Sequence, residues 1–371
     1  MKKFTLILAT VALLAAGCSK TEVVGPQNRK GINFAAYTAK TTKARQEDIT
    51  TGNLSAFKVT AFSNSAVYFD NVTFTKSTVW ESQTKYFWPV FSLTFCAYNT
   101  PIEYNDLAHK TGFARTITTT TQELEVSPAA ELAYQQDLVA AYAADKRASD
   151  AVNTNHSLSL TFNHYLTQVT VKATNENSTY QVVVDGVKIA NMVGHGKYTF
   201  SENKMTAAPG NTNTAVYTAT FDGKKLTSVA QEVMTNAGTG KWYLIPQTVT
   251  SWNPGTDYPN TNPSHGTYLA LKVKITANSG ALKIYPATGE NSGWMAVPIP
   301  DALEFAQGKK YTVNINFFSD AKKGAGYVDP EAGSDLDGDE VANDNGKKIS
   351  GEIKFNATVD PWGNNDIEIN L

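Results

Sequence analysis

The chain has 371 residues, of which 18% are charged, and its formal net charge is −2. This near-neutral balance gives no basic footprint for nucleic acid, so a nucleic-acid partner is excluded. The length is enough for two domains of ordinary size. The sequence holds two cysteines, Cys18 and Cys96. If Cys18 is modified and so cannot pair with Cys96, no disulfide can form within the chain. Burial of apolar side chains must then hold the fold together.

The N-terminus has the pattern of an export signal. Two lysines precede a mostly apolar run over residues 4–16, which is typical of a secretory signal and is too short to span a bilayer. The run ends in Leu-Ala-Ala-Gly before Cys18, which resembles the lipobox of bacterial lipoproteins. The resemblance implies removal of residues 1–17 and acylation of Cys18, a palmitate-type anchor. The alternative is an ordinary signal peptide with an incidental cysteine.

Residues after this cysteine predict where the protein goes. Ser19 follows Cys18, and no aspartate stands there to retain the protein in the inner membrane. By resemblance to the lipoprotein sorting rule, this favours delivery to the cell outer membrane. Residues 18–30 are polar, contain glycine and proline, and are predicted to be a tether between lipid and fold.

Short runs of alternating apolar and polar residues fill the rest of the chain. Such period-2 runs predict half-buried β-strands, and the Asn, Gly, Ser and Thr residues between them predict turns. Together they indicate an all-β fold of antiparallel sandwiches. The clearest runs cover residues 31–36, 56–62, 158–162, 269–275, 311–317, 353–359 and 367–371.

One stretch departs from this pattern. A serine, a proline and a glutamate around residues 127–131 suit a helix start, and the alanine-rich run that follows favours a short helix or turn near 128–135. Residues 137–142 fit either a helix or a strand. Polar and turn-forming residues at 145–156 predict a domain boundary, giving an N-terminal domain over 31–150 and a C-terminal domain over 151–371.

The sequence displays no catalytic constellation. The five histidines form no close metal-binding pair, and there is no nucleophile elbow or phosphate-binding glycine loop. His156 and His164 flank a predicted strand and are interpreted as packed or surface residues. Cys96 lies in an apolar run and is predicted to be buried and inert, since a nucleophilic role would need exposure and a nearby histidine.

An acidic segment is the one candidate for a cation site. It places oxygen ligands at alternate positions, as calcium loops do. Gly346 stands where an EF-hand would need glutamate, so the pattern is incomplete and a solvated acidic loop is favoured. Calcium is therefore a candidate cofactor at most. The candidate ligands are Asp335, Asp337, Asp339 and Asn343.

Trp252 is the candidate for contact with a glycan. It lies in a segment rich in Asn, Pro and Gly at residues 251–265, where an exposed indole could stack on a sugar of a host or bacterial surface ligand. The alternative is a tryptophan that packs in the core or at its rim.

Four motifs, taken in order, resemble the fimbrillin family, the subunits of type V pili. They are the lipobox at Cys18, the segment Leu-Ser-Leu-Thr-Phe-Asn-His-Tyr-Leu-Thr-Gln-Val-Thr-Val at 158–171, the segment Trp-Tyr-Leu-Ile-Pro-Gln at 242–247, and the closing motifs at 308–315 and 359–362. The resemblance implies two transthyretin-like antiparallel β-sandwich domains with Greek-key-like connections. It also implies a strand, and not a helix, at residues 137–143.

The resemblance further implies assembly by donor-strand exchange. A protease that cuts after arginine would remove the first strand together with the lipid, and a neighbouring pilin subunit would fill the vacated groove. Residues 31–40 are the removable strand, and Arg45 is the expected cleavage site because it lies in a polar stretch. A cut after Arg29 would leave the strand in place. The expected donor strand carries Ile367, Ile369 and Leu371 at period 2.

Three hypotheses for function follow from these motifs. The first is a structural pilus subunit that supports adhesion. The second is a non-polymerising outer-membrane lipoprotein of the same fold, acting as a pilus anchor or glycan-binding module. The third is a lipid-anchored hydrolase, for which the sequence displays no convergent catalytic residues. Processing at Arg45 separates the first two, because an anchor would keep its lipid and first strand.

Overall fold

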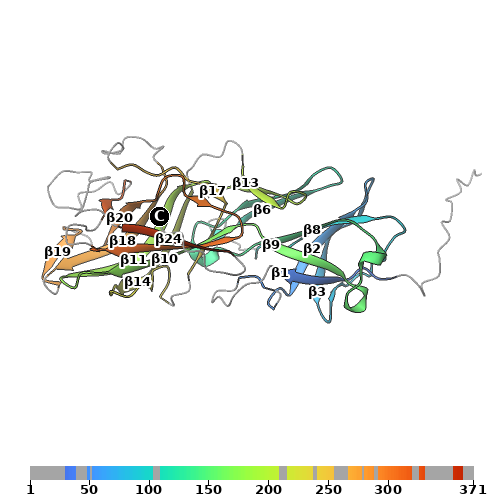
Figure 1. Ribbon diagram of the computed structural model, residues 1–371, viewed down its shortest axis with the longest axis horizontal. Coiled ribbons are helices and arrows are strands. Elements are labelled where there is room, and N and C mark those ends of the chain that lie inside the picture. Colours follow the sequence, from blue (N-terminus) through green and yellow to red (C-terminus); the bar gives the residue numbers. More distant parts are fainter. Residues whose placement is uncertain are drawn as a thin grey trace, which may run out of the picture.

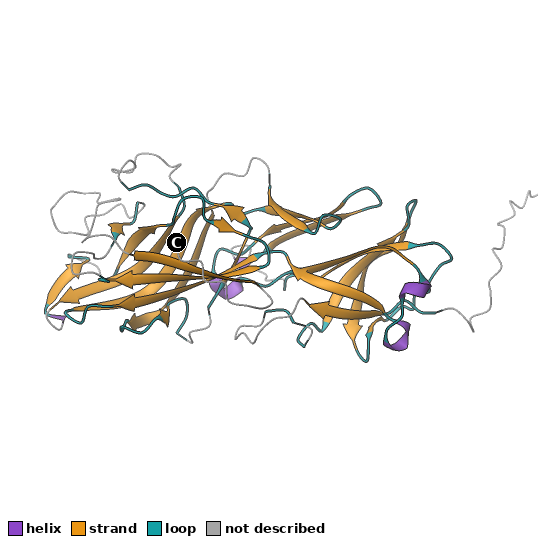
Figure 2. Ribbon diagram, in the orientation of Figure 1, coloured by secondary structure: helices purple, strands orange, loops and turns teal. Residues whose placement is uncertain are grey.

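The computed structural model describes residues 30–38, 48–50, 52–102, 109–208, 215–236, 240–254, 266–277, 280–287, 291–319, 326–330 and 354–361. These residues form an elongated molecule built almost wholly of strands (Figures 1 and 2). The only helices among them are short 3-10 turns at Leu132–Tyr134, Ala148–Asp150 and Thr154–His156. Within the described ranges, no helix is long and apolar enough to cross a bilayer. The predicted all-β class is confirmed, while the transthyretin-like connections stay a prediction.

The N-terminal half forms a sheet that closes into a barrel, at the right of Figure 1. The first strand, β1 (Phe34–Thr38), closes this barrel: it runs parallel to β9 (Leu158–His164) over five residue pairs and meets β4 (Trp80–Ser82) at Phe34 and Trp80. The strand order is β1 (Phe34–Thr38), β4 (Trp80–Ser82), β3 (Val67–Lys76), β2 (Ala56–Phe62), β5 (Leu93–Tyr98), β8 (Val139–Lys146) and β9 (Leu158–His164).

Alternation in the sequence explains which side chains fill the barrel. In β2, Phe57, Val59 and Ala61 are each at most 2% exposed, and they share one core with residues of β5 and β9. Successive side chains of a strand point to opposite faces, so a period-2 apolar run lines one face. Much of the barrel interior is aromatic. A strand that closes the barrel must therefore carry side chains whose size fits the space between these rings.

The chain leaves the barrel after His164 and not at the boundary predicted between residues 150 and 151. β9 pairs with β1 and β8, and its Leu158, Leu160 and Phe162 belong to the barrel core. The polar residues that suggested a boundary form a connection between two strands of the same barrel. They include the 3-10 turn Ala148–Asp150.

The C-terminal half is a sandwich of two sheets, at the left of Figure 1. Apolar residues of both sheets form one core cluster between them. The first sheet has the order β15 (Gln231–Glu232), β10 (Thr167–Asn175), β22 (Lys309–Phe317) and β24 (Lys354–Pro361), with β16 (Trp242–Leu244) on β10. The second has the order β14 (Ala215–Lys225), β11 (Tyr180–Met192), β18 (Tyr268–Ala277), β20 (Gly293–Pro298) and β23 (Tyr327–Val328), with β19 (Leu282–Tyr285) on β18. A small pair joins β17 (Gln247–Thr248) to β21 (Glu304–Phe305).

A four-stranded sheet ties the two halves together. It joins one hairpin from the first half to one from the second. A mixed core lies beneath it, with Tyr98 of the barrel, Leu124 of β7 (Gln122–Ser127), Tyr198 of β12 (Gly196–Thr199) and Tyr243 of β16. The two predicted domains are therefore interlocked. The strand order is β13 (Lys204–Ala207), β12 (Gly196–Thr199), β7 (Gln122–Ser127) and β6 (Gly112–Ile117).

The segment for which the sequence suggested a helix, a turn or a strand consists of two parts in the structure. A single 3-10 turn, Leu132–Tyr134, lies inside the predicted 128–135 segment, and Glu131 makes no side-chain cap there. From Val139 onward the chain is strand β8, paired with β5 at Cys96 and Tyr142. The strand implied by the family resemblance is confirmed, because β5 offers a long-range partner that overrides the local helix propensity of alanine.

Candidate functional site

The first strand closes the barrel with its inner face. Ile32, Phe34 and Ala36, two residues apart, are 2%, 0% and 2% exposed. Tyr37, on the opposite face, is 47% exposed. The groove occupied by this strand therefore has three successive subsites, which hold an aliphatic, an aromatic and a small side chain.

The middle subsite is aromatic on several sides. The ring of Phe34 lies 4.8 Å from Phe74, 5.4 Å from Phe95 and 6.1 Å from Phe57, centroid to centroid. These separations and tilted geometries suit favourable ring contacts. A strand that replaces β1 would have to fill this subsite or leave a cavity.

Backbone hydrogen bonds hold the residues that lead into this strand. Before β1, the Ile32 N–H donates to the Tyr86 carbonyl at 2.8 Å, and the Trp88 N–H donates to the Lys30 carbonyl at 3.1 Å. The Leu158 N–H then donates to the Asn33 carbonyl at 2.9 Å, where pairing with β9 begins. Loss of β1 would leave these groups without partners, so an empty groove favours binding of another strand.

A buried polar cluster fixes the chain just past the segment that contains Arg45. The Asp48 carboxylate is 2% exposed and accepts four hydrogen bonds from the C-terminal half. Three donors lie on strands β10, β16 and β22, and the fourth lies directly before β16. The donors are Lys241 at 2.6 Å, Lys310 at 2.7 Å, Gln168 at 2.7 Å and Tyr243 at 2.9 Å. We call these five residues the Asp48 cluster.

The electrostatics of this cluster favour a charged aspartate. Burial raises the pKa of Asp48, but hydrogen bonds and charges from Lys241 and Lys310 outweigh this and hold that pKa below its usual 3.8. Burial lowers the pKa of Lys241, and the positive charge of Lys310 adds to this, although Asp48 acts in the opposite direction. Two ammonium groups face the Asp48 carboxylate and stabilise its charged form. The lowered pKa of Asp48 therefore decides the charge state of the cluster.

The next residue is tied to the barrel. The Ile49 N–H donates to Asp137 Oδ2 at 2.7 Å, and His164 Nδ1 lies 3.0 Å from the same carboxylate. Asp137 precedes β8 and His164 ends β9, so Asp48 and Ile49 are anchored to both halves of the molecule. Sequence reasoning missed this cluster; the available signal was Lys241, a charge directly before the apolar motif at 242–247.

The lowered pKa of Asp48 predicts an acid-sensitive contribution to stability. An aspartate whose pKa is lower in the folded chain stabilises fully above about pH 4 and loses this contribution as pH falls through the folded value. We expect the difference in free energy of unfolding between wild type and Asp48→Asn to shrink from about pH 6 to about pH 3. Urea unfolding of both chains at each pH measures it, and a constant difference would contradict it.

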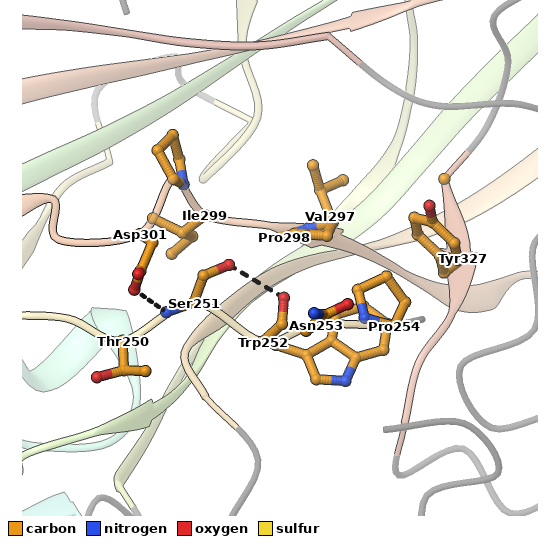
Figure 3. Close-up of a pocket in the computed structure, with 12 residues that line it drawn as sticks. Thr250, Ser251, Trp252, Asn253, Pro254, Val297, Pro298, Ile299, Asp301 and Tyr327 are labelled. Atoms are coloured by element: carbon orange, nitrogen blue, oxygen red, sulfur yellow. Dashed lines mark hydrogen bonds between the residues drawn. The ribbon is translucent and has the colours of Figure 1, made fainter. Parts of the chain in front are cut away.

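Trp252, the candidate for glycan contact, has the packed position that the sequence analysis kept as the alternative. Trp252 is 1% exposed, with its ring centroid 5.5 Å from Tyr268 and 5.8 Å from Tyr327. It lines a pocket of about 690 Å³ whose rim also includes Pro254 and Val297 (Figure 3). The ring packs on its neighbours and presents no free face for a sugar. Local composition suggested a surface loop, but packing on Tyr268 of β18 determines its position.

Two hydrogen bonds, marked in Figure 3, hold the backbone beside Trp252. Ser251 Oγ donates to the Trp252 carbonyl at 3.0 Å, and the Ser251 N–H donates to Asp301 Oδ1 at 3.1 Å. The polar groups of Ser251 and Asp301 next to the indole are thus hydrogen-bonded within the protein. The described geometry gives no assembled set of groups for catalysis.

Cys96 is buried as predicted. It is 0% exposed, and burial raises the pKa of its thiol. We expect a Cys18→Ser chain, in which Cys96 is the single cysteine, to resist a thiol reagent when folded at about pH 8 and to react fully in urea. Rapid labelling of the folded chain, at a rate near that of the urea-unfolded chain, would contradict this assignment.

Several predicted site residues lie outside the described residues, and their predictions stay as the sequence made them. Among the residues that are described, no group of three His, Cys, Asp or Glu side chains could hold a metal ion. The predicted residues outside the description are Cys18, Arg45, Asp335, Asp337, Asp339, Asn343, Ile367, Ile369 and Leu371.

The fold and the strand that closes the barrel can be compared with known proteins. Residues 42–330 match the family model described as fimbrillin-like, and the chain belongs to this family. This is a family of fimbrial structural subunits and not of enzymes, so the chain is a cell-surface protein that associates with other pilin subunits. No curated protein sequence matches the chain significantly.

Solved structures share the fold at low sequence identity. A fimbrial protein from Bacteroides vulgatus is 14% identical, with a TM-score of 0.51, over 90% of this chain and 100% of that one. A fimbrilin from Porphyromonas gingivalis is 10% identical, with a TM-score of 0.45, over 91% of this chain and 99% of that one. The first similarity supports the fold.

Proposed function

We propose that the protein is a pilus subunit that polymerises by donor-strand exchange and supports adhesion. Cleavage after Arg45 would release β1, and the C-terminal region of a neighbouring subunit would fill the barrel groove. The observation that carries this proposal is the position of β1. It is a short strand that closes the barrel, with Phe34 at 0% exposure, and the next residue that the structure describes after Thr38 is the anchored Asp48.

The Asp48 cluster supports the choice of cleavage site. A cut after Arg45 leaves Gln46 and Glu47 before the anchored Asp48, so the new N-terminus is short and fixed close to its end. A cut after Arg29 would leave β1 covalently attached. The cluster thus separates a removable part of the chain from a part that stays folded.

Strand exchange of this kind produces a filament. Each subunit would receive a strand at its barrel and give one from elsewhere in its chain, so the interface is head-to-tail and does not close on itself. Main-chain hydrogen bonds would provide affinity, and the three subsites would provide specificity. Before cleavage, the lipid predicted on Cys18 would hold the precursor at the outer membrane; cleavage would remove that anchor together with β1.

Cleavage is tested by a pair of arginine variants. We expect Arg45→Ala to accumulate as a lipidated precursor that gives no oligomer ladder on non-boiled gels of the cell surface. Arg29→Ala is the matched control and is expected to be cleaved and to polymerise as wild type does. Normal ladders from Arg45→Ala would contradict the proposal, and an uncut wild-type chain would favour the anchor hypothesis.

A further inference from the structure

One end of the barrel exposes a group of apolar side chains. Strand β5 begins at this end, where Leu93 pairs with Lys146 of β8 and Thr94 pairs with Phe62 of β2. The turn between β2 and β3, the segment between β4 and β5 and the connection between β8 and β9 therefore lie together, and the connection includes the 3-10 turns at the right-hand end of the barrel in Figure 2. The exposed apolar residues of these three segments, which we call the apolar tip, are Val67, Tyr68, Phe87, Val90, Phe91 and Val152.

Contacts within the protein fix the rings and the backbone of the apolar tip. The Tyr68 hydroxyl donates to the Phe87 carbonyl at 2.7 Å, and the ring centroids of Tyr68 and Phe91 lie 6.3 Å apart in an edge-on arrangement. Arg147 Nη1 donates to the Val90 carbonyl at 3.0 Å, while Val90 is 94% exposed. Single exposed apolar residues are common on protein surfaces, but a cluster of them indicates a surface that contacts an apolar partner.

The N-terminal chain enters the structure at this same end. The Gly31 backbone pairs with Phe87, and the Lys30 carbonyl accepts a hydrogen bond from the Trp88 N–H. Lys30 stands 12 residues after Cys18, the predicted lipid site. A linker of this length spans at most about 40 Å, at about 3.3 Å per residue, and on average about 20 Å. A lipid on Cys18 would therefore keep the apolar tip close to the membrane.

We propose that the apolar tip lies in the headgroup region of the membrane to which the uncut precursor is anchored. This inference rests on the lipid anchor of the proposed function and adds a second, non-covalent contact to it. Exposed phenylalanine and tyrosine suit this contact, because aromatic rings favour the boundary between headgroups and acyl chains. Binding through the tip alone would be weak, and the lipid makes it effective by holding the tip at a high local concentration.

Contact through the apolar tip would keep the predicted cleavage segment away from the membrane. From Lys30 at the tip, the extended chain runs roughly 25 Å to Thr38 at the end of β1. Asp48, where the described chain resumes, is bound by Lys241 of the C-terminal half. The segment that contains Arg45 thus connects two points remote from the membrane, where a soluble protease could reach it. Cleavage would remove the lipid, and the weak contact of the tip alone would then release the subunit.

Fluorescent labels on single exposed cysteines test this contact in the lipidated Arg45→Ala precursor, which is expected to stay uncut. The precursor is placed in vesicles of phosphatidylethanolamine and phosphatidylglycerol that contain a doxyl-labelled quencher lipid. A label on Val90→Cys is expected to lose at least about half of its emission, because it lies among the headgroups. Leu282→Cys is the matched control: Leu282 is 51% exposed on β19, at the opposite end of the molecule (Figure 1), and its label should keep its emission.

A second label separates an apolar contact from simple tethering by the lipid. Val152 is 78% exposed at the same end of the barrel, and a label on Val152→Cys should be quenched as well. Adding Val90→Asp and Phe91→Asp, at two exposed positions, is expected to abolish that quenching while circular dichroism shows an unchanged fold. Equal quenching with and without the two aspartates would contradict the proposal, because the tether alone would then explain it.

The remaining outcomes identify which step has failed. A precursor that floats with the vesicles while its Val90→Cys label keeps full emission would overturn the membrane contact and leave the proposed function standing. A precursor that does not float with the vesicles would contradict the lipid anchor and the inference with it. Shielding of the same label without vesicles, rising with protein concentration, would assign the apolar tip to a second copy of the chain and overturn the membrane contact.

Discussion

Replacing Phe34 with alanine is expected to lower the free energy of unfolding of the uncut chain by about 3–5 kcal/mol. The ring is 0% exposed and lies within 6.1 Å of three other phenylalanine rings, so its loss opens a cavity in the barrel. Urea unfolding followed by circular dichroism measures the change.

Tyr37→Ala is the matched control for Phe34→Ala, because it truncates an aromatic residue of the same strand that is 47% exposed. We expect that substitution to change the free energy of unfolding by no more than about 0.5 kcal/mol. A loss below about 1 kcal/mol for Phe34→Ala would mean that the ring does not hold β1 in the barrel.

Replacing Asp48 with alanine is expected to cost about 3–5 kcal/mol, because it leaves a buried ion cluster without its anion. Lys241 is 5% exposed and lies 2.6 Å from Asp48, so its charge would lose its compensation. Lys310, 2.7 Å from the other carboxylate oxygen, would be affected in the same way. Chemical denaturation of the uncut chain measures the effect.

An exposed ion pair provides the control for Asp48→Ala. Lys85, whose side chain is 57% exposed, pairs with Glu81 at the surface. Lys85→Ala should cost less than about 1 kcal/mol, since water replaces the lost partner. If Asp48→Ala cost no more than this control, the Asp48 cluster would not anchor the chain beside the cleavage site.

Alternation in the sequence predicted several of the longer strands, because a half-buried strand has apolar residues at every second position. Strand β2 occupies the predicted residues 56–62, and β18 and β22 contain the runs at 269–275 and 311–317. What alternation could not supply is the partner of each strand. The segment around residue 150 illustrates this, since β9 follows it in sequence and returns to pair with β1 across more than 100 residues.

The candidate site was predictable in part. Its strand, with Ile32 and Phe34 at period 2, was visible in the sequence. Its anchor was not, because Asp48 meets Gln168, Lys241 and Lys310 at separations of 120 to 262 residues, and no local pattern reports such pairs. Local composition did not decide the position of Trp252 either: its loop-like surroundings left both an exposed and a packed ring open, and tertiary contacts with Tyr268 bury it.

In the proposed filament, the first strand has departed and a sister molecule completes the barrel. N-terminal sequencing of the chain recovered from sheared surface filaments tests this. We expect Gln46 to be the first residue and the peptide containing Phe34 to be missing from the filaments. Filaments whose subunits begin at lipidated Cys18, or that retain the Phe34 peptide, would contradict it.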